Sequence, residues 1–95
     1  MTSVATPSRA ERIVNELRHA LHTDQVELID DSHLHAGHAG ARDGRGHFRV
    51  RVVSPDFAGL RTLQRHQLVY RSLGELMQTD IHALSIAALT PDEAR

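Results

Sequence analysis

Hydrophobic residues near the start of the chain recur at helical spacing. Ile13, Leu17 and Leu21 stand four residues apart, which lines one face of a helix of about four turns. Ser8 stands three residues before a glutamate and makes a capping box at the beginning of this helix. We expect the helix to end near His22.

Alternating apolar and polar positions indicate strands in the middle of the chain. Phe48, Val50 and Val52 alternate with arginines, which predicts a half-buried strand whose outer face carries arginine. Residues 26–31 predict a shorter strand before it. Residues 33–46 hold four glycines and follow neither period, so they are predicted to form a loop.

The second half of the chain returns to helical spacing. Residues 56–59 predict a turn, and residues 60–77 predict a helix divided into a short turn and then a longer helix. Its apolar stripe comprises Val69, Leu73, Leu76 and Met77, and His66 falls within this stripe. Residues 80–89, rich in small apolar side chains, predict the last strand.

The predicted order is therefore helix, strand, strand, helix and strand, with the second helix divided. The first two strands form an antiparallel hairpin, and a right-handed crossover places the third strand parallel to the second. The result is an α+β fold in which helices cover one face of a three-stranded mixed sheet. We expect a disordered terminus over residues 1–7, one domain over 8–91 and a tail over 92–95. So small a domain gains stability from a partner or from a weak homodimer.

The amino-acid composition excludes several kinds of site and function. The chain has 95 residues, eight histidines, no cysteine and a formal net charge of −1. Disulfides and thiol nucleophiles are excluded, and a general polyanion binder is disfavoured. No apolar run approaches the length of a membrane span, and the expected location is the cytoplasm. Nucleophile-elbow and phosphate-loop motifs are absent, so no enzyme is predicted.

The histidines are the candidate metal ligands, because imidazole binds transition metals. His33, His35 and His38 crowd the predicted loop, where a solvated loop is favoured over a zinc or nickel site formed by the loop alone. His66 is either a half-buried histidine bonded to backbone or a metal ligand on a rigid helix. Its position alone favours the first reading.

Four further histidines are given structural roles. His47 and His82 begin the second and third predicted strands. His19 and His22 lie near the end of the first helix, where a cation complements the helix dipole.

Ordered motifs in the second half make the chain resemble the BolA family. They are Gly46–Val50, Val53–Ser54, Phe57–Gly59, Arg65–Tyr70 and Ile81–Ile86. The resemblance runs from about Arg9 to Pro91. It is strongest with the branch that has histidine, rather than cysteine, in the loop between the first two strands.

This resemblance implies a class II KH-like fold and a monothiol glutaredoxin as partner, the two proteins sharing a [2Fe–2S] cluster. In the family, the glutaredoxin cysteine and a bound glutathione supply sulfur, and the BolA-like protein supplies a helix histidine, here His66, and a loop residue. His38, nine residues before His47, matches the loop position, with His35 as its rival. Arg65 is expected to contact the partner or its glutathione.

The expected function is that of a non-enzymatic protein in iron–sulfur cluster trafficking, assembly or iron regulation. Mixed cysteine and histidine ligation raises the cluster potential, and acid should weaken binding because an imidazole ligand must lose its proton. The alternative is a DNA-binding transcriptional regulator that uses Arg61, Arg65 and Arg71. Near-neutral charge and few aromatic residues argue against it.

Overall fold

A computed structural model of the chain describes residues 7–32 and 45–95. The predicted order of elements is confirmed. The elements are α1 (Arg9–Ala20), β1 (Val26–Asp30), β2 (Gly46–Val53), the 3-10 helix η3 (Pro55–Phe57), α2 (Thr62–Leu73), α3 (Leu76–Thr79) and β3 (Ile81–Leu89).

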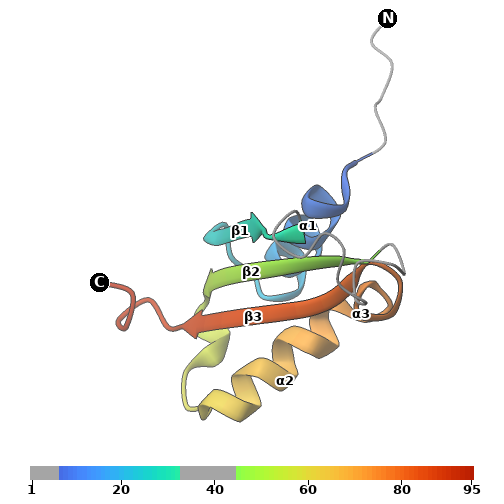
Figure 1. Ribbon diagram of the computed structural model, residues 1–95. Coiled ribbons are helices and arrows are strands. Elements are labelled where there is room, and N and C mark those ends of the chain that lie inside the picture. Colours follow the sequence, from blue (N-terminus) through green and yellow to red (C-terminus); the bar gives the residue numbers. More distant parts are fainter. Residues whose placement is uncertain (1–6, 33–44) are drawn as a thin grey trace, which may run out of the picture.

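The three strands form one mixed sheet in the order β1-β2-β3 (Figure 1). β1 and β2 are antiparallel, with Leu28 opposite Val50. β2 and β3 are parallel, with Val50 opposite Ile86, because the chain returns through α2 and α3 before β3 begins. The predicted α+β architecture is confirmed, and the long middle strand is held on both sides.

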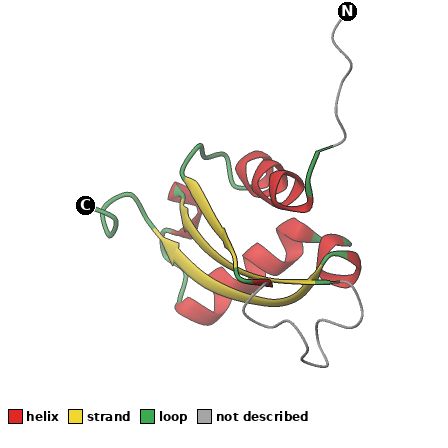
Figure 2. Ribbon diagram, turned by 45° about the horizontal axis from the view of Figure 1, so that its top comes forward, coloured by secondary structure: helices red, strands yellow, loops and turns green. Residues whose placement is uncertain are grey.

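The core lies between one face of the sheet and the helices (Figure 2). Phe48, Val50 and Val52 of β2 are buried, whereas Arg49 between them is exposed, as the alternating pattern predicts. The helices contribute Ile13, Leu17, Leu21, Val69 and Leu73 to the same cluster, which Phe57 completes. Burial of these side chains is the main force that holds the helices on the sheet.

The predicted division of the second helix is wrong in its order. The longer helix α2 comes first, and the short α3 follows it. Gly74 separates them with a φ of 54°, a left-handed conformation that glycine adopts at little cost. The predicted turn at residues 56–59 is partly replaced by η3, which Ser54 caps by accepting a hydrogen bond from the Asp56 N–H.

Asp80 ties the first helix to the beginning of β3. Its side chain is almost fully buried, and its Oδ2 lies 2.5 Å from Arg12 Nη2 and 3.5 Å from Arg9 Nε. The Thr79 hydroxyl donates to its Oδ1 at 2.6 Å. A paired, hydrogen-bonded carboxylate can be buried without large loss of stability, so Asp80 fixes where β3 begins.

Gly46 occupies a position at the beginning of β2 that admits no side chain. A Cβ atom there would lie 2.7 Å from both the Ser32 Oγ and the Phe48 ring. We therefore predict that Gly46→Ala lowers the free energy of unfolding by about 1–3 kcal/mol through overpacking. Urea unfolding followed by circular dichroism measures this, with Gly59→Ala as a comparison, since a Cβ at Gly59 meets nothing within 4 Å and only its φ of 78° is strained. A fully stable Gly46→Ala variant would contradict the packing described.

Candidate functional site

Two histidine rings lie together at the edge of the sheet where β2 and β3 begin. The centroids of His47 and His82 are 5.0 Å apart, with the ring planes tilted by 47°. His47 is half-buried and His82 is exposed. Such a pair offers imidazole nitrogen to a transition metal from two neighbouring strands.

A register shift sets the direction of the His82 side chain. Gly46 pairs with Ile81, but His47 pairs with Ala83, so His82 is an extra residue in β3. Extra residues of this kind re-aim a side chain and are common beside functional sites.

Both described ends of segment 33–44 contact this histidine pair. The His47 N–H donates to the Ser32 Oγ at 3.1 Å, and Arg45 Nη2 lies 3.4 Å from His82 Nδ1. The predicted loop ligands His33, His35 and His38 fall within that segment, outside the described residues. Ser32 and Arg45, the residues that flank this segment, therefore contact His47 and His82 respectively.

Asp31 holds the end of β1 in place beside the pair. Its N–H donates to the His47 carbonyl at 2.8 Å. Its carboxylate is largely buried and accepts from Arg49 Nε at 2.5 Å and Nη2 at 3.3 Å. This bidentate contact is the geometry that an arginine fork favours, and it gives the site a rigid border.

His66 lies on α2, away from this pair. It is half-buried, and it follows Arg65, whose guanidinium contacts the Ala88 carbonyl at 3.1 Å. Six residues of extended strand, about 20 Å, separate His82 from Ala88. The described residues thus bring His82, rather than His66, beside Arg45 at one end of the histidine-bearing segment. The metal role of His66 stays a prediction.

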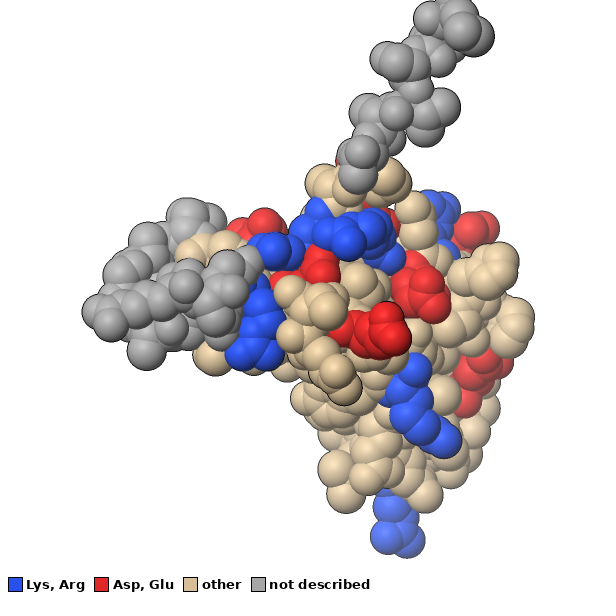
Figure 3. Space-filling model, turned by 90° about the vertical axis from the view of Figure 1, so that its right-hand side faces the viewer, with Lys and Arg blue, Asp and Glu red and all other residues tan. Residues whose placement is uncertain are grey.

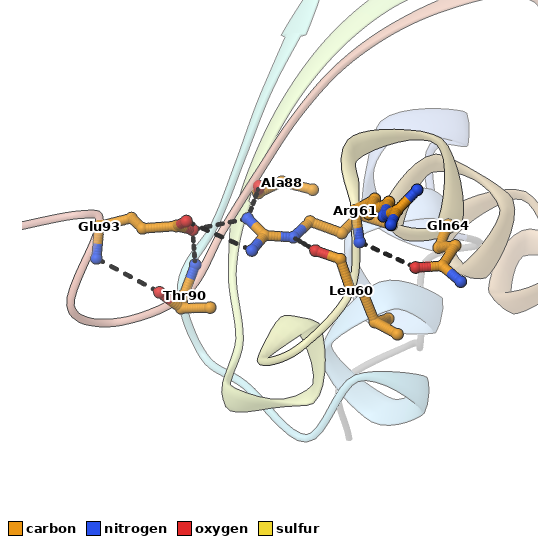
Figure 4. Close-up of polar contacts among 7 residues, drawn as sticks. Leu60, Arg61, Gln64, Ala88, Thr90 and Glu93 are labelled. Carbon is orange, nitrogen blue, oxygen red and sulfur yellow. Dashed lines mark hydrogen bonds and ion pairs between the residues drawn. The ribbon is translucent and has the colours of Figure 1, made fainter.

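The Arg65 side chain is bound within the molecule by Leu60, Ala88 and Glu93, three residues labelled in Figure 4. Its side chain is only 14% exposed, and besides Ala88 it donates to the Leu60 carbonyl at 2.9 Å and to Glu93 Oε1 at 2.6 Å. The guanidinium therefore joins the beginning of α2, the end of β3 and the C-terminal turn. Contact with a partner or with glutathione stays a prediction for this residue.

The Arg65 guanidinium holds the Glu93 carboxylate in its charged form. Hydrogen bonds from Arg65, and then from the Thr90 N–H, lower the pKa of Glu93 from 4.5 to about 2. A carboxylate whose pKa is lower in the folded state stabilises the fold above its unfolded pKa. That contribution disappears as the pH falls through about 2.

We predict that Glu93→Gln lowers the melting temperature at pH 6 and that the deficit shrinks on acidification from about 4.5 towards 2. The reason is that wild-type Glu93 becomes protonated over this interval and loses its ionic contact. Thermal unfolding of both proteins across the pH range measures it. A deficit that is constant with pH would show that the charge of Glu93 contributes nothing.

The two remaining candidate DNA contacts are exposed, Arg61 as the N-cap residue of α2 and Arg71 within that helix. The Arg61 N–H is used locally, donating to Gln64 Oε1 at 2.9 Å. On the face shown in Figure 3, basic and acidic side chains are intermixed. This arrangement differs from the one-sided basic surface typical of nucleic-acid-binding proteins.

One contact of the site was not predicted. His47 and His82, for which structural roles are predicted, lie with their ring centroids 5.0 Å apart. Their places at the starts of neighbouring parallel strands were the available signal. Within residues 7–32 and 45–95, no three His, Asp or Glu side chains are grouped closely enough to hold a metal ion.

Comparison with known proteins defines the class. The family model described as BolA-like protein matches residues 17–93. The BolA domain of SufE1 from Arabidopsis thaliana superposes with a TM-score of 0.79 and 40% identity, covering 94% of this chain and 99% of that domain. The chain belongs to the BolA family.

Two named members of the family are similar to this chain over most of its length. Protein BOLA1, chloroplastic, of Arabidopsis thaliana is 41% identical over 97% of this chain, and the chain spans 59% of that protein's length. The DNA-binding transcriptional regulator BolA of Escherichia coli is 39% identical over 87% of this chain and 76% of its own length. Neither name describes an enzyme. One relative is chloroplastic, so the cytoplasmic location stays a prediction; none of the described helices is long and apolar enough to span a membrane.

Proposed function

We propose that this BolA protein is the imidazole-bearing half of a heterodimer with a monothiol glutaredoxin, and that the two proteins share a [2Fe–2S] cluster. The observation that carries the proposal is the His47–His82 pair at the ends of the histidine-bearing segment. A chain without cysteine offers no thiolate to a cluster, so the sulfur ligands come from glutaredoxin and its glutathione. The role is non-enzymatic, in cluster trafficking, assembly or iron regulation.

The geometry favours His82 over His66 as the ligand from the described residues. His82 is exposed and extra to the strand register, so a partner can reach its ring without unpacking the core. Arg45, which follows segment 33–44, lies 3.4 Å from His82 Nδ1, and His38 or His35 supplies the second ligand in this proposal. His47 packs against His82 and orients its ring.

Imidazole ligation gives the shared cluster its chemical character. Two histidines in place of two thiolates raise the reduction potential of a [2Fe–2S] centre, as in Rieske proteins. Each imidazole must be neutral to bind iron, so proton uptake competes with ligation. The resulting complex releases its cluster more readily in acid than an all-sulfur centre does.

Reconstitution tests the proposal. A monothiol glutaredoxin is mixed with this chain, glutathione, ferrous iron and sulfide under anaerobic conditions, and the products are separated by size. We expect a coloured one-to-one heterodimer whose visible circular dichroism differs from that of the glutaredoxin alone. His19→Ala, at the distant end of α1, is the matched control and should leave the spectrum unchanged. If all iron stays with glutaredoxin while this chain elutes colourless, the proposal is wrong.

DNA binding is the second candidate, favoured by the name of the Escherichia coli relative. Arg61 and Arg71 are exposed and available to phosphates, whereas Arg65 is held internally. The test is a salt titration of binding to two unrelated duplexes. Specific binding keeps a preference for one duplex at physiological salt, while equal, steeply salt-dependent binding to both indicates phosphate contacts alone.

A further inference from the structure

The two edge strands of the sheet differ in how they are protected against pairing with another chain. β1, at one edge, has five residues and carries Glu27 and Asp30. β3, at the other edge of the described sheet, has nine residues, Ile81–Leu89, with no charged residue and no proline. Charges, prolines and short length are the usual means by which edge strands avoid pairing with another chain. β3 has none of these.

Successive residues of β3 direct their N–H and C=O groups alternately towards β2 and away from it, which identifies the groups that β2 leaves without a partner strand. The Ser54 N–H donates to the Leu89 carbonyl at 2.9 Å, so Leu89 and every second residue before it direct their N–H and C=O groups towards β2. Leu84 and Ile86 therefore direct theirs outwards. Ala88 does so as well, but its carbonyl accepts from Arg65, which marks one end of the open edge.

We propose that a second copy of this chain pairs with this edge, β3 against β3 in antiparallel orientation about a two-fold axis through Ser85. This register places Leu84 of each copy opposite Ile86 of the other and satisfies four outward N–H and C=O pairs. It leaves the Arg65–Ala88 contact and the His82 site undisturbed. In this register each copy offers the same backbone groups to the other, those of Leu84 and Ile86, as a two-fold interface requires.

Side chains and charges on the strand permit this approach. Ala83, Ser85 and Ala87 are small and exposed on the open face of β3, so no bulky side chain on that face obstructs the pairing. The arginines of β2 lie one strand further in, and in the dimer the two β2 strands are about 14 Å apart, three strand spacings. That exceeds the Debye length of about 8 Å at physiological salt. Since few hydrogen bonds form, we expect a weak dimer that depends on concentration.

Cross-linking tests the register. Ser85→Cys places two thiols on the axis, about 4.5 Å apart between Cα atoms for a non-hydrogen-bonded pair, within the range of a disulfide. The chain has no other cysteine, so no intramolecular disulfide can form; one oxidised glutathione converts the two paired thiols into an intermolecular disulfide and two reduced glutathiones, through a mixed disulfide with glutathione that the second thiol displaces. Ala87→Cys is the matched control, because its thiols lie about 13 Å apart in this register. We expect dimer from the first variant and several-fold less from the second; equal yields, or none, overturn the register.

Sedimentation equilibrium without glutaredoxin tests the dimer itself, independently of the proposed cluster function. Ser85→Lys sets two like charges face to face and should weaken dimerisation about tenfold or more. Ala87→Lys adds the same charge opposite an alanine and should weaken it less. Wild-type protein that stays monomeric at millimolar concentration overturns the proposal, as does dimerisation that Ser85→Lys leaves unchanged. Binding of a foreign extended peptide at this edge, with no self-association, would also overturn it.

Discussion

Replacing Phe57 by alanine should lower the free energy of unfolding by about 3–5 kcal/mol. Phe57 is fully buried and is the largest of the completely buried side chains. It lies in η3, between the end of β2 and the beginning of α2, and fills the core that both elements share. A domain of this size has about 5–15 kcal/mol in total, so the variant should be close to unfolding. Urea denaturation followed by far-ultraviolet circular dichroism gives the value.

Two control variants distinguish the effect of the cavity left by Phe57→Ala from the effect of changing or shortening a side chain. Phe57→Leu keeps most of the buried volume and should cost less than about 1.5 kcal/mol. Leu63→Ala removes an apolar side chain that is 67% exposed and should change stability by less than about 0.5 kcal/mol. A Phe57→Ala variant as stable as Leu63→Ala would mean that η3 does not close the core.

Replacing His82 by alanine should abolish the shared cluster spectrum of the proposed heterodimer. The variant loses the exposed imidazole that lies beside Arg45, the residue after segment 33–44. His66→Ala, on α2 near the far end of β3, should keep the spectrum, and His47→Ala should weaken it by loosening the ring of His82. Visible circular dichroism of each reconstituted complex makes the comparison.

Fold and ligation must be distinguished in this series. His82 is exposed, so His82→Ala should retain its far-ultraviolet spectrum and melt within a few degrees of wild type. If His66→Ala abolishes the cluster while His82→Ala keeps it, the ligand suggested by sequence resemblance is right and the geometric choice is wrong.

Periodicity in the sequence predicts most of the fold because it reports burial directly. The four-residue spacing of Ile13, Leu17 and Leu21 and the alternation along β2 each correspond to one buried face. The division of the second helix was misjudged because it depends on Gly74, whose left-handed conformation is a property of the folded chain. Hydrophobic pattern carries no signal for it.

The candidate site was only partly predictable, since it depends on contacts between distant residues. Arg65 and His66 are neighbours in sequence, yet Arg65 is fixed by Ala88 and Glu93, 23 and 28 residues away. His47 and His82 meet only because β2 and β3 are parallel and shifted in register at their start. A single sequence gives the alternation of a strand but not its register with another.

Nitrogen ligation from this chain is the central claim, and pulsed electron paramagnetic resonance tests it most directly. This chain is labelled with ¹⁵N-histidine, combined with unlabelled glutaredoxin and reduced by one electron to make the cluster paramagnetic. The account predicts strong nitrogen couplings that change from those of ¹⁴N to those of ¹⁵N on labelling. A reduced cluster that shows no coupling to the labelled nitrogen would contradict it.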